Sequence, residues 1–205
     1  ELSEIALYTI HRELSNVRPD LKILPFLGSI NNKERVSAIL KKYFVQTVYH
    51  AAAYKHVPMV EYNNNEGVNN NIFGTLACAE AAIDNNVETF VLISTDKAVL
   101  PTTFMGATKR ISEMLIQIFS KKYDNTKFSI VRFGNVIGSS GSVIPLFEEQ
   151  INKGGPVTIT DSKVTRFFMS MKEAALLVIQ ASAMSNRNSI YVLDYYQLSF
   201  LIHSQ

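Results

Sequence analysis

Short apolar runs of strand length alternate along this chain with segments of helical periodicity, and this alternation constrains its fold more than any other feature. Four runs are rich in Val, Ile and Phe, as buried parallel strands are: residues 21–27, 46–51, 89–94 and 128–133. Apolar residues repeat at helical spacing in residues 4–14, 33–43, 72–83 and 106–123. This order predicts βαβ units, and therefore a parallel sheet covered by helices on both faces.

The pattern loosens after Val136, where residues 138–142 are rich in Gly and Ser and predict a loop. Beyond it we expect a helix over 143–153, a strand over 157–160, a helix over 171–184 and a strand over 189–193. Residues 195–205 break the rhythm and are assigned to no element.

The composition excludes several classes of function. The 205 residues, 47% of them hydrophobic, suit one α/β domain with at most a small appendage. Twenty basic and 18 acidic residues give a net charge of +2, which argues against a nucleic-acid partner. The single cysteine, Cys78, excludes a disulfide framework, and we predict no metal site. No apolar stretch approaches the ~20 residues of a membrane span, and no secretory signal leads the chain. We therefore expect a soluble, cytoplasmic domain without membrane contact in this segment.

Three expected strands run into polar residues at their carboxyl ends, which is where ligands bind to open parallel sheets. These endings are residues 50–56, 94–97 and 134–135. Loops between strands and helices are often polar without a functional reason. Three polar endings at one edge nevertheless indicate a binding site better than any one of them does.

The helix that follows residues 94–97 carries Met105 and Lys109 one turn apart, and therefore on one face. A Ser-Thr-Asp strand end, followed by a helix with this spacing, resembles the extended short-chain dehydrogenase/reductase family. In that family a Ser or Thr at the strand end works with Tyr-x-x-x-Lys over a nicotinamide ring. Here Met105 occupies the tyrosine position, and a thioether has no proton to exchange.

Six motifs in order make the resemblance more specific: HAAAYKHVP (50–58), NNIFGT (70–75), STDKA (94–98), MGATKR (105–110), VRFGNVIGSSGS (131–142) and VTITDSKVTRFFM (157–169). Together they resemble the nucleotide-sugar 4,6-dehydratases that act on UDP-N-acetylglucosamine in capsular or surface polysaccharide biosynthesis. The likeness covers about residues 2–194. It implies a Rossmann-like doubly wound sheet, with an NAD(P)-binding core over 1–135 and a small, mainly substrate-binding part over 136–205.

The resemblance also implies a reaction. Enzymes of this kind oxidise C4 of the sugar by hydride transfer to NAD or NADP, eliminate water across C5 and C6, and return the hydride to C6. The product would be a UDP-4-keto-6-deoxy-N-acetylhexosamine. Related hexose dehydratases use an adjacent Asp-Glu pair for the elimination, and here the corresponding pair is Asp96-Lys97.

By that resemblance Asp96 is the general acid, Lys97 is the C5 base, and Thr95 hydrogen-bonds the 4-hydroxyl of the sugar. Lysine can act as a base only if burial, or nearby positive charge such as Lys109, lowers its pKa well below ~10.4. The proton of the 4-hydroxyl would pass to Asp96, to Lys97 or to a water molecule. The alternative is that Asp96 and Lys97 lie in a solvated loop and have no catalytic role.

Further residues are assigned by position in the same motifs. Lys109 would hold the nicotinamide ribose, and the other cofactor positions are Ala51, Ala52, Ala53, Asn71 and Ser94. For Asn71 and the alanines, simple packing is the alternative. The expected positions for the UDP-sugar are Lys55, His56, Asn135, Ser142, Thr158, Thr160 and Arg166. Arg166 is the best pyrophosphate ligand among them, since a guanidinium binds phosphate oxygens through two parallel hydrogen bonds. His50 is expected to be a near-core histidine.

The sequence departs from the family at its start. None of its nine glycines precedes Gly28, so the glycine-rich phosphate loop and the residue that distinguishes NAD from NADP are not present. We expect that the first βα unit is missing and that the chain forms homo-oligomers. Two alternatives remain open: a nucleotide-sugar C4 epimerase, and a Rossmann-like protein that binds a UDP-sugar or a partner without turnover. The stereochemistry at C5, and a membrane segment before Glu1, also remain open.

Overall fold

The main sheet of the computed structural model contains four parallel strands in the order β1-β2-β3-β6. They are β1 (Thr47–His50), β2 (Thr89–Thr95), β3 (Lys127–Phe133) and β6 (Ser189–Val192). The structure describes residues 1–138, 143–158, 165–184, 189–192 and 196–199. All four strands run in the same direction, so their carboxyl ends meet at one edge of the sheet, as the sequence predicted.

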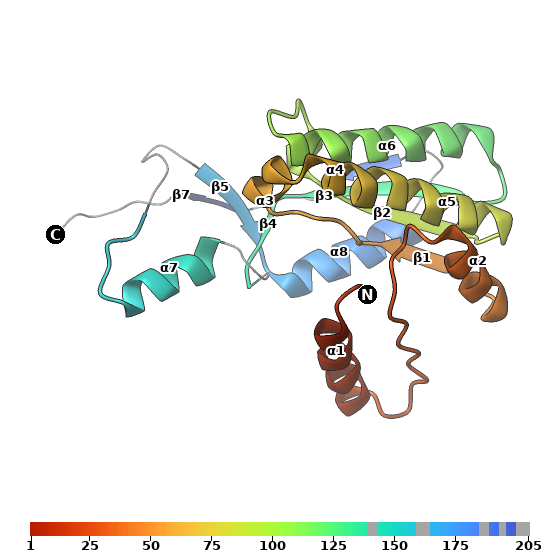
Figure 1. Ribbon diagram of the computed structural model, residues 1–205, viewed down its shortest axis with the longest axis horizontal. Helices are drawn as coiled ribbons and strands as arrows, with labels where there is room; N and C mark the ends of the chain where they lie inside the picture. Colours follow the sequence, from red (N-terminus) through yellow and green to blue (C-terminus); the bar gives the residue numbers. More distant parts are fainter. Residues whose placement is uncertain (139–142, 159–164, 185–188, 193–195, 200–205) are drawn as a thin grey trace.

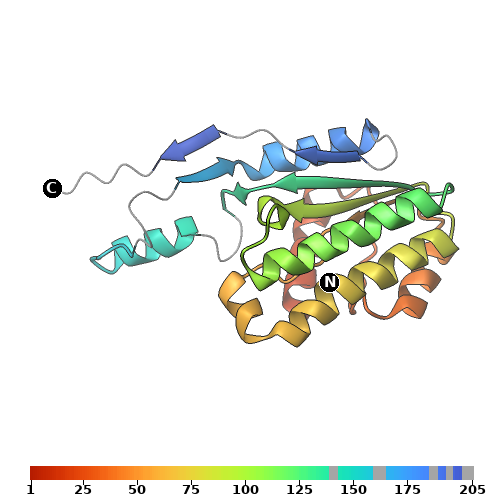
Figure 2. The ribbon, with the colours of Figure 1, turned by 90° about the horizontal axis from the view of Figure 1, so that it is seen from above.

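Helices cover both faces of this sheet. Figure 2 shows α5 (Gly74–Asp84) and α6 (Phe104–Lys122) side by side along one face, with α8 (Met171–Ala183) on the other. α2 (Lys33–Lys42) packs beside α5. Side chains alternate along β2: Phe90 and Leu92 pack beneath α2, α5 and α6, whereas Val91 packs with α8. The chain is thus an α/β protein with a Rossmann-like, doubly wound parallel sheet.

A second, smaller sheet lies beyond the carboxyl edge of the main one (Figure 1). It consists of β4 (Asn135–Val136), β5 (Thr165–Met169) and β7 (Tyr196–Ser199); β4 and β5 are parallel, and β7 is antiparallel to β5. α7 (Val143–Asn152) lies on the same side of the molecule.

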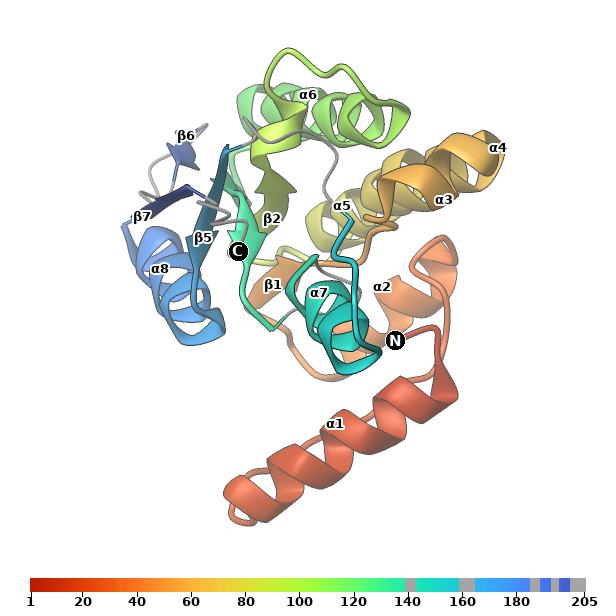
Figure 3. The same cartoon turned by 90° about the vertical axis from the view of Figure 1, so that its left-hand side faces the viewer.

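α1 (Glu4–Val17) projects away from the sheet, and none of its residues is buried (Figures 1 and 3). Ser3 caps it, because its hydroxyl accepts a hydrogen bond from the Ala6 N–H. Across the described ranges, no helix combines the length and the apolar character needed to cross a membrane.

The prediction of a strand over residues 21–27 is wrong. The backbone of this segment pairs with no described strand: the Leu21 N–H donates to the Arg18 carbonyl (3.1 Å), the Glu1 amino group donates to the Phe26 carbonyl (3.2 Å), and Arg35 donates to the Leu27 carbonyl (2.8 Å). The side chains of Leu21, Leu24 and Leu27 are exposed, because this segment is not part of either sheet.

The strand expected over 157–160 is also not found at 157–158, which have no regular structure, while 159–160 lie outside the described residues. Seven elements of the described chain were not expected from the sequence. They are α3 (Val57–Tyr62), α4 (Asn64–Gly67), the π-helix η1 (Val68–Phe73), the 3₁₀ turn η2 (Asp96–Ala98) and the strands β4, β5 and β7.

Candidate active site

The carboxyl end of β2 presents the Thr95-Asp96-Lys97 segment, in which Asp96–Ala98 form a single 3₁₀ turn, η2. The Lys97 N–H donates to the Thr95 hydroxyl (3.3 Å). The Thr95 hydroxyl in turn donates to Asp96 Oδ1 (2.9 Å), and Lys97 Nζ donates to the same oxygen (3.1 Å). About two fifths of each charged side chain is exposed, 40% for Asp96 and 38% for Lys97. The acid and the amine are therefore in direct contact and open to a ligand.

The first turns of α6 lie beside this segment and carry Met105 and Lys109. Thr103 caps the helix through the Gly106 N–H (3.1 Å), and Met105 is only 3% exposed. Lys109 Nζ donates to the Ile93 carbonyl of β2 (2.6 Å). Burial lowers the pKa of Lys109 to about 8, and the charge of Glu113 acts in the opposite direction.

Gly106 allows the catalytic segment to approach α6 closely. A Cβ atom at this position would lie 2.3 Å from the Lys97 carbonyl oxygen. No side-chain adjustment relieves contact with a backbone atom, so glycine is required for the observed packing.

Asn71, in η1, holds the loop after β1 against α6. Its side-chain oxygen accepts from the Tyr54 N–H (2.8 Å), and its amide donates to the Tyr54 carbonyl and to Thr108 Oγ1 (3.0 Å each). Asn71 is 1% exposed. This arrangement accounts for Asn71 by packing and hydrogen bonding alone, and its role toward a cofactor stays a prediction.

His50 is buried at the end of β1, as expected, with Nε2 2.9 Å from Thr75 Oγ1. Burial, with a smaller contribution from the charge of Lys109, lowers the pKa of His50 to about 3. The imidazole is therefore neutral at physiological pH and forms part of the core.

A pocket of about 570 Å³ lies between the loop after β1 and helices α3 and α4. Two predicted substrate residues, Lys55 and His56, line it together with the predicted cofactor residue Ala53. The remaining lining residues are Tyr54, Met59, Val60, Asn63 and Glu66. Ala51 and Ala52 lie on the same loop and are exposed.

Two other predicted substrate residues that the structure describes, Asn135 and Thr158, do not line this pocket. Asn135 lies half-buried in β4, and Thr158 is exposed and bonded to Gln150 of α7. Arg166 lies in β5, but its side chain is not among those described. Ser142 and Thr160 fall outside the described residues.

The sequence reasoning missed a buried ionic cluster behind the segment. Glu113 of α6 is 0% exposed and accepts hydrogen bonds from Ser94 Oγ (2.7 Å), Arg110 Nη1 (2.9 Å) and Arg132 Nε (2.7 Å). Ser94, a predicted cofactor residue, is therefore engaged with the protein interior. An arginine inside the apolar strand 128–133 was the available signal, because a buried arginine requires an acidic partner.

No group of three or more His, Cys, Asp or Glu side chains in the described part of the chain is arranged to hold a metal ion. Charge at the site comes from Asp96, Lys97 and Lys109 instead. The arrangement can donate, accept and relay protons at the end of β2.

The chain is similar to several curated proteins. It is 49% identical over 192 residues to the capsular polysaccharide biosynthesis protein CapD of Staphylococcus aureus, covering 93% of this chain and 32% of CapD. It is 38% identical over 170 residues to a UDP-N-acetylglucosamine 4,6-dehydratase (inverting) of Campylobacter jejuni, covering 82% of this chain and 50% of that protein. It is also 38% identical over 176 residues to a UDP-glucose 4-epimerase of Rickettsia rickettsii, covering 85% and 50%. The chain thus spans about a third to a half of these relatives.

Solved structures show the same fold. Pen from Bacillus thuringiensis superposes with a TM-score of 0.87 at 38% identity, over 96% of this chain and 60% of Pen. DesIV from Streptomyces venezuelae, a dTDP-glucose 4,6-dehydratase solved with NAD, superposes with a TM-score of 0.81 at 19% identity, over 97% of this chain and 75% of DesIV. At that identity the second likeness concerns the fold alone.

A family model described as "Polysaccharide biosynthesis protein" matches residues 1–202, which is nearly the whole chain. The match agrees with the likeness to CapD and with the Rossmann-like sheet that carries the site. This chain belongs to the polysaccharide biosynthesis protein family.

Proposed function

We propose that this chain is the catalytic and substrate-binding part of a nucleotide-sugar 4,6-dehydratase that converts UDP-N-acetylglucosamine to a 4-keto-6-deoxy product. The observation that carries the proposal is the contact between Asp96 and Lys97 at the end of β2, beside a buried Met105. Two groups that exchange protons are open to a ligand, while the usual tyrosine position holds none. This set of side chains suits the elimination of water better than a reaction that needs a tyrosinate base.

The residues at this edge fit the nicotinamide-ribose end of NAD or NADP. Among the described residues the Ile93 carbonyl is the only acceptor for Lys109, so two of its three N–H donors can bond ribose hydroxyls. The exposed Ala51 and Ala52 leave room beside the backbone for a dinucleotide. When bound, the nicotinamide supplies a reversible hydride acceptor.

Asp96 and Lys97 would share the proton transfers of the elimination. The 3.1 Å contact between Lys97 Nζ and Asp96 Oδ1 would let a proton pass from the ammonium to the carboxylate once a bound sugar excludes water from the pair, which is 38–40% exposed without it. That transfer leaves a neutral amine, which can take the C5 proton, and a neutral acid, which can protonate the departing C6 hydroxyl. Thr95, bonded to the same carboxylate oxygen, would turn its hydroxyl to the 4-hydroxyl of the sugar, whose proton would pass to a water molecule because Asp96 already holds the proton from Lys97.

The nucleotide sugar would enter beside the pocket that Lys55 and His56 line. The cationic Lys55 in its lining suits the negative diphosphate of UDP. Asn135, Ser142, Thr158, Thr160 and Arg166 stay predicted contacts to the UDP part.

The test uses the full-length protein that contains this chain, incubated with UDP-N-acetylglucosamine and NAD or NADP. Mass spectrometry is expected to show the loss of one water from the nucleotide sugar without net accumulation of reduced cofactor. Asp96→Asn and Lys97→Ala are each expected to abolish the product, whereas the exposed Lys121→Ala, at the far end of α6, serves as the matched control. Near-normal turnover in either site variant would remove the assigned roles.

The likeness to a UDP-glucose 4-epimerase supports a second candidate, a C4 epimerase on the same scaffold. An isomer of unchanged mass in the same incubation would favour it. Binding of the UDP-sugar with no product would favour a non-catalytic protein. The buried thioether at Met105 argues against the epimerase, since it cannot serve as the proton-exchanging base.

A further inference from the structure

Three residues of α6 hold the end of β2 from one side. Gly106, Lys109 and Glu113 are spaced by three and four residues, so they share one face of the helix. Gly106 lies against the Lys97 carbonyl, Lys109 bonds the Ile93 carbonyl, and Glu113 accepts from the Ser94 hydroxyl. α6 therefore contacts the Thr95-Asp96-Lys97 segment at its end, at Lys97, and holds the two residues that precede it, Ile93 and Ser94.

Glu113 is the one carboxylate on this face, and it is completely buried. Burial alone would raise its pKa, but hydrogen bonds from Arg132, Ser94 and Arg110 hold that pKa below the usual value. The side chain is therefore ionised, with one oxygen shared by Ser94 and Arg132 and the other by Arg110 and Arg132.

A cluster of this kind is a weak source of stability, because desolvation of buried charges offsets much of their attraction. Its location suggests another purpose. In the sheet register Ser94 pairs with Arg132, so Glu113 links the next-to-last residues of β2 and β3, one position before Thr95.

We infer that Glu113 is a positioning residue: through the Ser94 hydroxyl it fixes the end of β2, and through its charge it keeps Lys109 protonated for the cofactor ribose. The inference rests on the proposed function. Glu113 cannot touch substrate, since none of it is exposed. It acts through Ser94 and Lys109.

The surroundings of Lys109 explain why this charge matters. The titratable group that influences it is Glu113 from α6, while His50 from β1, which burial and the charge of Lys109 itself keep from charging, is neutral above about pH 3. The β2 contact is an uncharged carbonyl. Among the described residues Glu113 is thus the one negative charge that favours the ammonium form of Lys109, while Arg110 and Arg132 beside it carry the opposite sign.

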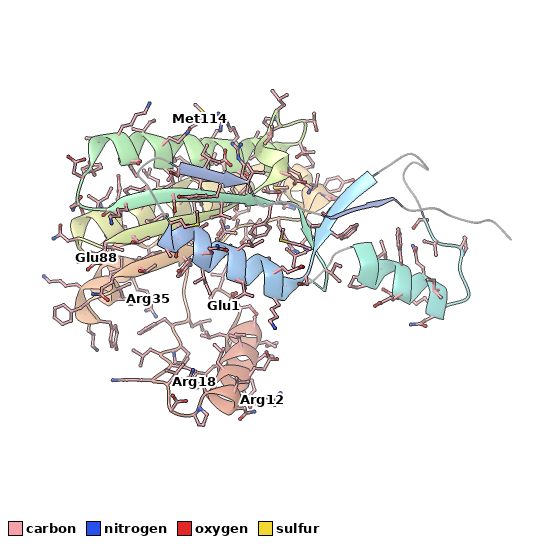
Figure 4. The ribbon with its side chains drawn as sticks, turned by 180° about the vertical axis from the view of Figure 1, so that it is seen from behind. Glu1, Arg12, Arg18, Arg35, Glu88 and Met114 are labelled. Carbon is pink, nitrogen blue, oxygen red and sulfur yellow. The ribbon has the colours of Figure 1, made fainter. Side chains whose placement is uncertain are left out.

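The first test measures the titration of Lys109 without turnover. Competitive trace acetylation of the full-length protein at a series of pH values, read by mass spectrometry, follows each lysine separately. In Glu113→Gln the midpoint of Lys109 is expected to fall by about 1 pH unit or more. In Arg110→Gln, which removes a partly exposed side chain, the midpoint is expected to rise, because less of the Glu113 charge is neutralised. Glu88→Gln, at the opposite edge of the sheet (Figure 4), is the matched control and should leave it unchanged.

The second test is steady-state turnover. Glu113→Gln is expected to lower kcat by about 10-fold to 100-fold with KM within about 3-fold, and to move the high-pH limb of kcat to lower pH. An unmoved Lys109 midpoint in both Glu113→Gln and Arg110→Gln, or a wild-type kcat in Glu113→Gln, would overturn the inference. If the wild-type protein makes no 4-keto product, the proposed function fails instead, and the acetylation titration still reports separately on Glu113 and Lys109.

Discussion

Replacing Gly106 by alanine tests whether α6 sets the position of the catalytic segment. The added Cβ would lie 2.3 Å from the Lys97 carbonyl oxygen, 3.1 Å from Thr103 Oγ1 and 3.2 Å from Pro101 Cβ. Ordinary contact begins near 3.4 Å, so the Lys97 carbonyl and α6 must separate by about 1 Å. The first contact is with backbone, and the whole turn that carries Asp96 and Lys97 must therefore move.

Two effects are expected from this displacement. Overpacking of a buried site costs about 1–3 kcal/mol of the free energy of unfolding. A displacement of about 1 Å at the reacting groups lowers turnover by about 100-fold. We therefore expect Gly106→Ala to fold, to be less stable by that amount, and to lose kcat much more than it loses substrate affinity.

Urea denaturation and initial rates of 4-keto product formation measure the two effects separately. Ile116→Val is the matched control, because Ile116 is 1% exposed on the same helix and its truncation costs about 1 kcal/mol without contact to Lys97. A wild-type kcat in a destabilised Gly106→Ala would refute the positional argument. An unchanged free energy of unfolding would refute the close approach itself.

Three further predictions concern single residues. Asn71→Ala removes an amide that bonds both backbone groups of Tyr54 and is expected to lower the free energy of unfolding by about 2–4 kcal/mol, measured by urea denaturation. Because burial lowers the pKa of His50 from 6.5 to about 3, folding favours its neutral form: this contribution is fully present above pH 6.5 and is lost as pH falls. The free energy of unfolding should therefore fall by about 1.4 kcal/mol per pH unit between those values, and His50→Gln should flatten that slope; an unchanged slope contradicts the assignment. Lys55→Met is expected to raise KM for the nucleotide sugar by about 10-fold with little change in kcat, and an unchanged KM would remove Lys55 from the substrate site.

Much of the fold could be predicted from the sequence, because a doubly wound sheet imposes a local pattern. β2 is apolar at consecutive positions since Phe90 and Val91 pack against different helix layers. The segment 21–27 is also apolar, but its backbone pairs with no strand of either sheet, so it is not a strand. The composition of a segment indicates how readily it forms a strand, but a strand also needs a neighbouring strand to pair with.

The short helices α3 and α4 and the π-helix η1 were missed for a different reason. Pro58 and the asparagine clusters of residues 63–71 are typical of turns. Tertiary contacts override that tendency: Glu61 accepts from the Phe104 N–H at the start of α6 (2.7 Å), and Asn71 bonds across to Tyr54.

The candidate site, too, could be predicted only in part. Thr95, Asp96, Lys97 and Lys109 could be placed at one edge because they follow a strand directly or start the next helix. The cluster of Glu113 with Ser94 and Arg132 could not, because its members come from three elements whose contacts depend on the register of β2 and β3.

The central claim is that hydride leaves C4 of the sugar and returns to C6 of the same molecule. The most direct test is incubation of the full-length protein with UDP-N-acetylglucosamine that carries deuterium at C4, followed by NMR of the product. The proposed reaction predicts a dehydrated product with deuterium at C6 and none at C4. Deuterium retained at C4 in a product of unchanged mass would contradict it.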